Sequence, residues 1–274
     1  MMSPLFESLV VNNLTILTDE PDDSTAMVWN EAEVQTELEN NEKAIYRLDL
    51  NDKEVLLEEI EDSMAYNKTQ KLKDLRLDKN EFFDEGVELL VQAPALKKLL
   101  TLSLAYNKLT DQAVEALASS EILGNLQKLF LQGNRIGVGG LKALVASETL
   151  SNLQLLYLNL NPIGPEGGKV LGGPGKISQL EELYLQKIGL GEKGLQALCE
   201  SENFKNLKLL DLYETSLGSE GGRVLAESKN LSNLQTLILI HNDINDETQE
   251  LIKNSKNLPN LTKVVFLPPK KAED

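Results

Sequence analysis

Large apolar residues recur along this chain with a strict period of 27 residues, from Ile45 to Leu261. Each period begins with the pattern Leu-x-x-Leu-x-Leu-x-x-Asn-x-Leu, and no insertion interrupts the series. The alternation in this pattern predicts a β-strand whose apolar residues at the fourth and sixth positions of each unit point inward. A fixed period of this kind predicts a stack of similar units, with successive strands pairing in parallel.

The second half of each unit has the spacing of a helix. Its fifteenth position is Gly or Ala in six of the eight full units, and its nineteenth position is apolar in seven, as in Gly140 and Leu144. We expect the small residue to let the helix approach the strand closely, while the apolar residue fills the core. Because a helix is wider than a strand, the stack should curve into an α/β horseshoe. Parallel strands would line its concave face, and helices would cover its convex face.

The ninth position of most units is an asparagine. Its members are Asn80, Asn107, Asn134, Asn161 and Asn242. A buried amide at this place can bond backbone groups where each strand ends, which predicts a ladder of hydrogen bonds along the stack. Lys53, Ile188 and Thr215 interrupt the series. Threonine replaces part of the bonding, whereas Ile188 predicts a local irregularity or a bound water.

The repeat divides the chain into three segments. Residues 1–44 lack the pattern and carry ten acidic side chains but no Lys or Arg up to residue 42. We interpret them as an acidic cap with a helix between residues 29 and 43, since the end of a solenoid needs a polar covering unit. Residues 45–267 hold eight full units and a final strand. Residues 268–274 form a short tail whose Pro and Lys discourage pairing at the sheet edge.

The net charge of −16 is concentrated in the acidic flank. Nucleic acid is not expected as a partner, since phosphate binding needs basic clusters. A basic protein partner is compatible with this charge, although acidity also keeps proteins in solution. No run of 18 apolar residues predicts a membrane span. The single cysteine, Cys199, and the lack of a basic region before the apolar stretch of residues 1–17 favour a cytoplasmic location.

Residues that could support catalysis are few. His241 is the only histidine, and we interpret it as a surface residue; Cys199 should pack in a helix. Residues 164–169 resemble a phosphate-binding loop but lack its Gly-Lys-Ser/Thr ending, and neighbouring units repeat the same register. Residues 172–175, Gly-Gly-Pro-Gly, should shorten their helix and leave a mobile convex loop. We therefore expect no enzyme activity, no metal site and no cofactor.

The longer phrase Asn-Leu-x-x-Leu-x-Leu-x-x-Asn-x-Ile-Gly-x-x-Gly-Gly-x-x-Leu resembles the ribonuclease-inhibitor-like class of leucine-rich repeats. It is complete at residues 152–171, and at residues 125–144 only its second paired glycine differs, as Leu141. In that class, partners usually dock on the inner face or rim of the horseshoe. The chain lacks the cysteines and alternating unit lengths of ribonuclease inhibitor, and the long acidic C-terminal region of the Ran activator. Its uniform units look most like bacterial members, some of which are effectors delivered into host cells.

The outward positions of the strands hold the candidate binding residues, because the fold leaves them free to vary. Phe130, Tyr157 and Tyr184 occupy the fifth position of three successive units and form a predicted aromatic stripe on the inner face. Exposed aromatic clusters with a polar surround are typical of interaction sites. Seven further residues complete the predicted site. Flanking the stripe are Tyr106, Tyr213, Leu155 and Leu209, and orienting the partner from the rim are Lys187, Asp211 and Glu214.

The sequence therefore predicts a non-catalytic module that binds a protein on its concave face. Cross-strand stacking of aromatic residues also stabilises a sheet by about 0.2–1 kcal/mol per pair, so a purely structural stripe is one alternative. A second alternative is a regulator of a small GTPase or other enzyme, acting in trans through a rim residue such as Asn51 or Arg135. A third is a bacterial effector that assembles host proteins. A homodimer through the apolar C-terminal edge is the least favoured.

Overall fold

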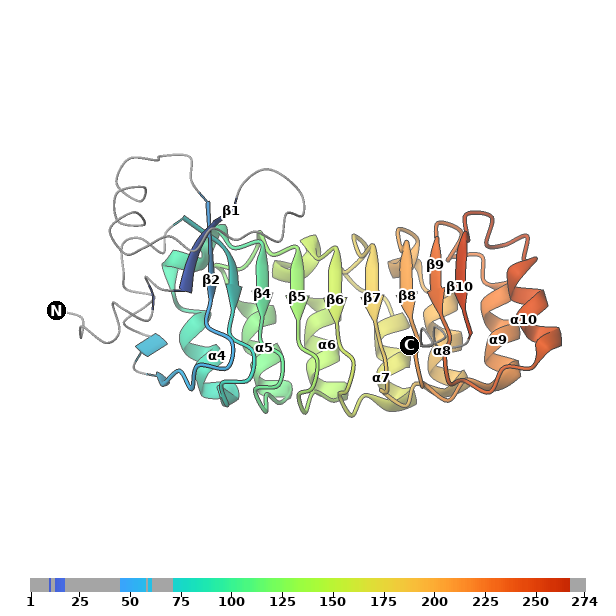
Figure 1. Ribbon diagram of the computed structural model, residues 1–274, viewed down its shortest axis with the longest axis horizontal. Helices are drawn as coiled ribbons and strands as arrows, with labels where there is room; N and C mark the ends of the chain where they lie inside the picture. The colour runs from blue at the N-terminus through green and yellow to red at the C-terminus, as the bar shows by residue number, and fades with distance from the viewer. Residues whose placement is uncertain (1–9, 11–12, 18–44, 58, 61–70, 267–274) are drawn as a thin grey trace, which may run out of the picture.

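The computed structural model describes residues 10, 13–17, 45–57, 59–60 and 71–266. The helix predicted between residues 29 and 43 and the tail at residues 268–274 lie outside these ranges. The labels of helices and strands follow Figure 1, including its gaps in numbering. Within the described ranges, no helix has the length and apolar character that crossing a bilayer requires.

The described strands form one open sheet whose order follows the chain from β1 to β10 (Figure 1). Its members are β1 (Leu14–Leu17), β2 (Ile45–Asp49), β3 (Leu72–Arg76), β4 (Thr101–Ser103), β5 (Lys128–Phe130), β6 (Leu155–Tyr157), β7 (Glu182–Tyr184), β8 (Leu209–Asp211), β9 (Thr236–Ile238) and β10 (Lys263–Val265). Strands β2 to β10 pair in parallel, as the repeat predicted. Strand β1 was not predicted, and it pairs antiparallel with β2 at the first edge.

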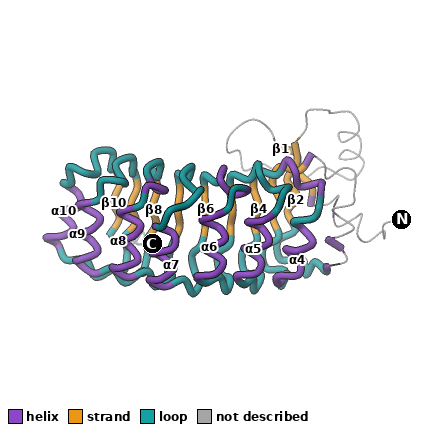
Figure 2. The backbone as a smooth tube through the Cα atoms, turned by 180° about the vertical axis from the view of Figure 1, so that it is seen from behind, coloured by secondary structure: helices purple, strands orange, loops and turns teal. Residues whose placement is uncertain are grey.

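The helices lie on one side of the sheet, in front of the strands in the reverse view (Figure 2). They are α4 (Phe83–Leu90), α5 (Asp111–Ser119), α6 (Val138–Ala146), α7 (Gly164–Gly172), α8 (Gly191–Glu200), α9 (Gly218–Glu227) and α10 (Asp246–Lys253), with 3-10 turns η2 (Pro94–Lys98), η3 (Thr149–Asn152) and η4 (Glu202–Phe204). Leucines at the fourth and sixth strand positions, such as Leu129 and Leu131, are fully buried beneath these helices. The α/β solenoid predicted from the sequence is therefore confirmed, and the opposite side of the sheet is called the strand face below.

The asparagine ladder is present. The Asn134 Oδ1 accepts hydrogen bonds from the backbone N–H groups of Asn107 (2.9 Å) and Leu109 (3.1 Å) in the preceding unit. Its Nδ2 donates to the carbonyls of Leu104 (3.0 Å) and Leu131 (2.9 Å). The amide thus ties two units together at the point where their strands end, as the sequence predicted.

Two of the three non-asparagine positions, Thr215 and Ile188, behave differently from each other. The Thr215 hydroxyl donates to the Leu212 carbonyl at 2.7 Å, which replaces part of the missing amide. At Ile188, which is buried, no such bond is possible. The backbone N–H of Ile163, whose equivalents in other units reach an asparagine Oδ1, instead donates to the Asn161 carbonyl at 2.8 Å. The irregularity predicted at Ile188 is therefore a local turn in the preceding unit.

Small residues in the helices allow contacts other than the predicted contact between helix and strand. A Cβ atom added at Gly168 would lie 2.7 Å from the Cα of Gly194, so helices α7 and α8 meet there backbone to backbone. A Cβ atom at Gly167 would lie 2.3 Å from the Ile163 side chain, in the loop of the same unit. The atoms nearest to these glycines belong to a loop or to a neighbouring helix and none to a strand, so the prediction of a helix–strand approach was wrong.

The Gly-Gly-Pro-Gly segment after α7 is packed between its neighbours. Helix α7 ends at Gly172, one position earlier in the repeat than α6 (Ala146) and α8 (Glu200), which confirms the predicted shortening. The Asn203 Nδ2 donates to the Gly173 carbonyl at 2.8 Å, and the Lys176 N–H donates to the Val145 carbonyl at 2.8 Å. A Cβ atom at Gly175 would lie 2.3 Å from Val145. These glycines let the loop fit closely against adjoining units, which contradicts the expectation of a free convex loop.

Candidate protein-binding site

The aromatic stripe lies on the strand face of β5, β6 and β7, where Phe130, Tyr157 and Tyr184 are register partners in neighbouring strands. The rings of Phe130 and Tyr157 stack with centroids 4.9 Å apart, and those of Tyr157 and Tyr184 with centroids 3.8 Å apart. All three side chains are half-buried. Parallel strands bring residues at the same position of successive units side by side, so the 27-residue period creates this stack directly.

The tyrosine hydroxyls extend the stack into a polar chain. The Tyr184 hydroxyl donates to Glu182 Oε2 at 2.9 Å, and it also shares a hydrogen bond with the Tyr157 hydroxyl. Burial raises the pKa of both phenols above their ordinary value, and the nearby carboxylate of Glu182 acts in the same direction. Both tyrosines are therefore neutral at physiological pH and present hydroxyl groups together with flat apolar rings.

Asp211 lies directly beside the stripe, as the register partner of Tyr184 on strand β8. Its side chain is buried, with only 3% of the residue exposed, so it does not lie on the rim as predicted. It accepts hydrogen bonds from Gln186 Nε2 and from the backbone N–H of Tyr213. Burial raises the pKa of the Asp211 carboxyl group, although these two bonds oppose the shift. The sheet thus holds a carboxylate in an environment that disfavours its charge.

Four of the other predicted residues frame this region. Leu155 and Leu209 are half-buried, and they are the first residues of strands β6 and β8. Lys187 and Glu214 form an exposed ion pair of 3.2 Å, and the Lys187 ammonium lies 5.5 Å from the centre of the Tyr213 ring.

Two predicted tyrosines lie outside the stack. Tyr213 meets His241 edge to face at 5.2 Å. Tyr106 is 44% exposed in the loop after β4, and its ring covers Gly133. The structure therefore groups Tyr213 with the rim, while Tyr106 stands apart from the stripe.

A row of amides beside the stripe was missed by the sequence analysis. Gln132, Asn159 and Gln186 occupy the seventh position of three successive units, two residues beyond the aromatic rings. The carbonyl oxygens Gln132 Oε1 and Asn159 Oδ1 are buried without a hydrogen-bond donor. Unsatisfied buried acceptors are costly and uncommon. The 27-residue spacing of these residues could have predicted the row. Their lack of hydrogen-bond donors could not be predicted, because it depends on the positions of the neighbouring rings.

Two buried or partly buried carboxylates at the N-terminal end of the array are bonded within the sheet. Asp74, which is 5% exposed, accepts from Arg47 Nε at 2.7 Å and from Arg76 Nε at 3.3 Å. Asp78 accepts from the Ser103 hydroxyl at 2.5 Å and from the backbone N–H of Ala105 at 2.9 Å. These charges are used within the sheet, and they leave the aromatic region as the stronger candidate.

The residues considered for catalysis fit their structural interpretations. His241 is exposed, whereas Cys199 is buried in α8, where burial raises the pKa of its thiol to about 12. Residues 164–169 form the first turns of α7, as the equivalent segments do in α6 and α9. Across the described residues, no group of three or more His, Cys, Asp or Glu side chains is placed to hold a metal ion.

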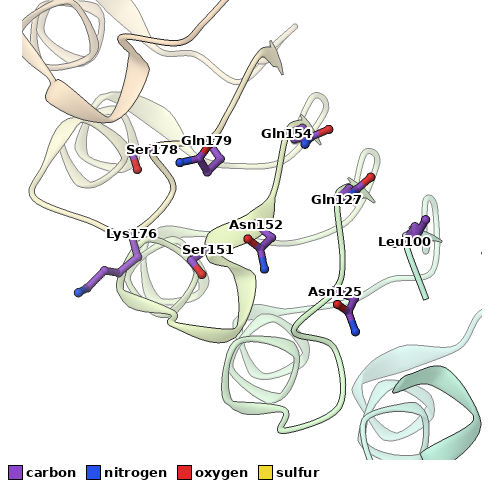
Figure 3. Close-up of a pocket in the computed structure, with 9 residues that line it drawn as sticks. All are labelled: Leu100, Asn125, Gln127, Ser151, Asn152, Gln154, Lys176, Ser178 and Gln179. Atoms are coloured by element: carbon purple, nitrogen blue, oxygen red, sulfur yellow. The ribbon is translucent and has the colours of Figure 1, made fainter. Parts of the chain in front are cut away.

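A shallow polar groove of about 500 Å³ lies where the chain enters strands β4 to β7 (Figure 3). It is lined by Leu100, Asn125, Gln127, Ser151, Asn152, Gln154, Lys176, Ser178 and Gln179. Asn125 and Asn152 Nδ2 atoms donate to the carbonyls of Lys97 and Gly124, which makes a second asparagine ladder that the sequence analysis did not identify. No aromatic ring lines this groove, so it offers no apolar contact comparable to the stripe.

Comparisons with known proteins agree with this architecture. A family model described as "Leucine Rich repeat" matches residues 95–118, 125–145 and 149–172. No curated protein matches the chain. Among solved structures, internalin C2 from Listeria monocytogenes has 25% identity, covering 72% of this chain and 62% of its own, with a TM-score of 0.38. Internalin inlF from the same organism has 19% identity, the same two coverages and a TM-score of 0.43.

A third structure, TLR13 solved with ssRNA13, has 21% identity and a TM-score of 0.50, covering 78% of this chain and 30% of its own. The chain therefore spans less than two thirds of each of these three proteins. At this identity the likeness concerns the fold alone. The stack of parallel strands backed by helices, with the likeness to TLR13, shows a leucine-rich-repeat solenoid fold, and the family model matches three stretches of its repeats.

Proposed function

We propose that this protein is a non-catalytic interaction module that binds another protein on the strand face of β5 to β8, its predicted concave face. The observation that carries the proposal is the continuous stack of Phe130, Tyr157 and Tyr184, which remains half exposed. Protein-binding sites are rich in tyrosine, and their strongest contacts cluster around buried aromatic residues.

The packing of the stripe favours binding. Each ring is already held by its neighbour, so a partner that covers it orders few additional side chains and loses little conformational entropy. Leu155 and Leu209 extend the apolar surface on one side. The exposed ion pair of Lys187 and Glu214 lies at the rim, where charges act mainly on association rate and specificity.

The test is an affinity pull-down from a cell lysate, with quantitative mass spectrometry, using the intact protein and a Phe130→Ala/Tyr157→Ala/Tyr184→Ala variant. A matched control carries three substitutions of exposed helix residues, Glu115→Ala, Lys142→Ala and Lys193→Ala. Circular dichroism first establishes that both variants are folded. Loss of one specific protein from the stripe variant alone supports the proposal. Equal recovery by all three proteins contradicts it and leaves the stripe as a structural stack.

A second candidate is a regulator that places a side chain into the active site of an enzyme. Arg135 suits this role because its side chain is exposed at the rim. Asn51 suits it less, since its Oδ1 already accepts a hydrogen bond from the Asp78 N–H at 2.7 Å. A regulator of this kind predicts that Arg135→Ala lowers the turnover of a captured enzyme without weakening its capture. An equal loss of capture and turnover would reject it.

A further inference from the structure

We propose that the partner places an arginine guanidinium group on the strand face beside Tyr184, between the carboxylates of Glu182 and Asp211. This inference rests on the proposed function and adds the chemical group that the partner must carry. Two observations lead to it, namely the charge balance of the site and the end of the aromatic stripe at Tyr184.

The charge balance of the strand face is uneven. Asp74 and Asp211 are both buried carboxylates on this face, 5% and 3% exposed. Two guanidinium groups, those of Arg47 and Arg76, neutralise Asp74. Among the described residues, no Lys, Arg or His lies within ion-pair distance of Asp211. A buried charge without a counter-ion is costly, so Asp211 lacks what the same face supplies to Asp74.

Nearby lysines do not fill this role. Lys187 pairs with Glu214 at 3.2 Å, and Lys208 pairs with Glu181 at 2.7 Å just before strands β8 and β7. Glu182, two residues before Tyr184, accepts only the Tyr184 hydroxyl among the described side chains. The two carboxylates therefore present a negative field that reaches Tyr157, whose phenol pKa both of them raise.

The aromatic stripe ends at this point. One face of the Tyr184 ring stacks on Tyr157, and on its other side the neighbouring strand carries the short side chain of Asp211. A guanidinium group is planar, stacks on aromatic faces and binds carboxylates through two parallel hydrogen bonds. A group lying on the open side of Tyr184 would extend the stack and reach Glu182 at the same time.

The hydrogen-bonding groups of the site also favour a guanidinium group. It carries five N–H donors and no acceptor, which complements the two carboxylates of Glu182 and Asp211. A lysine ammonium would satisfy the charge, but it lacks the flat shape that matches a stack of rings.

The experiment uses the full chain with ¹³C-labelled tyrosine and follows the ring resonances by NMR. The probes are three acetylated and amidated tripeptides, Gly-X-Gly, in which X is arginine, lysine or citrulline. Citrulline keeps the planar shape of arginine but carries no charge. We expect the arginine peptide to shift the Tyr184 resonance in a saturable manner, with an affinity about tenfold higher than the citrulline and lysine peptides.

An isosteric double variant, Asp211→Asn/Glu182→Gln, assigns the site. It should reduce arginine binding about tenfold, to the level of citrulline. Glu192→Gln, an exposed change on the first turn of α8, should leave it unchanged.

Several results would overturn the inference. These are equal shifts by arginine and citrulline, equal affinity for lysine, no saturable shift with any peptide, or full binding by the double variant. The pull-down with the stripe variant is independent of this result. If the stripe variant loses its partner but the peptides do not discriminate, the guanidinium assignment fails and the proposed function stands.

Discussion

The rings of Tyr157 and Tyr184 lie face to face, with 3.8 Å between their centroids and 11° between their planes. Phe130 joins them from the other side of Tyr157 at 4.9 Å and 27°. Tyr157 is therefore the central ring, and it is the only one of the three that contacts two others. The arrangement exists without a partner, so the stripe stabilises the sheet and also offers the preformed surface on which the proposed function depends.

Because it is central, Tyr157 should contribute most to the stability of the stack. Tyr157→Ala is expected to lower the free energy of unfolding by about 1–3 kcal/mol, since it removes two aromatic contacts of about 0.5–1.5 kcal/mol each. Tyr157→Phe keeps the rings and should cost much less. Urea denaturation followed by circular dichroism measures both. A loss no larger than that of Tyr106→Ala, which removes a ring outside the stack, would show that stacking contributes little.

The asparagine ladder predicts a second difference in stability. Asn134 makes four hydrogen bonds to backbone groups, so Asn134→Ala leaves buried donors and acceptors unpaired. We expect a loss of about 2–4 kcal/mol, from the cost of burying several unpaired groups. Thr215→Ala removes a single hydroxyl and should cost about 1 kcal/mol. Thermal and urea unfolding compare the two variants. Equal losses would mean that the additional hydrogen bonds of Asn134 contribute nothing to stability.

The glycine at the end of α7 predicts a steric effect. A Cβ atom at Gly172 would lie 2.3 Å from the Ala197 carbonyl oxygen in α8, a backbone atom that cannot rotate away. Gly172→Ala should therefore destabilise the protein by about 1–3 kcal/mol, as overpacking commonly does. Gly124 has no atom within 4 Å of an added Cβ, so Gly124→Ala should be neutral or slightly stabilising. A similar loss in both variants would contradict the close approach of α7 and α8.

Asp211 predicts a dependence of stability on pH. Its carboxyl pKa is raised in the folded state, so the folded chain binds this proton more tightly than the unfolded chain. The resulting stabilisation is complete below the unfolded pKa of about 3.9, and it is lost as the pH rises through the folded pKa. At pH 7 the ionised group therefore disfavours folding.

Asp211→Asn removes this charge with little change in shape, because the Gln186 amide can turn to keep its hydrogen bond. We expect the variant to be more stable than the natural protein at pH 7 by about 1 kcal/mol, the lower range for burying a polar group. The difference should shrink on acidification towards pH 4. Unfolding at both pH values tests this, and a variant less stable at pH 7 would show that the ionised carboxylate supports the fold.

Cys199 should be unreactive in the folded protein. It is 4% exposed, and burial raises the pKa of its thiol to about 12, so the reactive thiolate is scarce at pH 8. A thiol reagent such as DTNB is expected to label it only after denaturation in urea. Rapid labelling of the native protein would show that α8 opens locally.

The fold could be predicted from the sequence because successive units contain the same pattern of apolar and polar positions. Strand register, buried leucines and the ladder around Asn134 all follow from one 27-residue pattern. Departures from the pattern were harder to predict. Strand β1 lies outside the repeat, and the close packing at Gly172 depends on the neighbouring helix α8.

The candidate site could be predicted in part. The stripe followed from the fifth strand position, since parallel pairing places equivalent residues side by side. The burial of Asp211 did not follow, because it depends on the size of the side chains around it. Nor could the sequence separate Asp74, which two arginines neutralise, from Asp211, which has no such partner among the described residues.

The proposed function requires that a protein partner binds the strand face through the aromatic stripe. Isothermal titration of the captured partner measures this binding, with the intact protein, Tyr184→Ala and the helix-surface control compared under identical conditions. We expect Tyr184→Ala to weaken binding by at least about 30-fold, the loss of a contact worth about 2 kcal/mol or more, and the control to bind normally. Unchanged affinity in Tyr184→Ala together with weakened affinity in the control would place the binding surface on the helices and contradict the account.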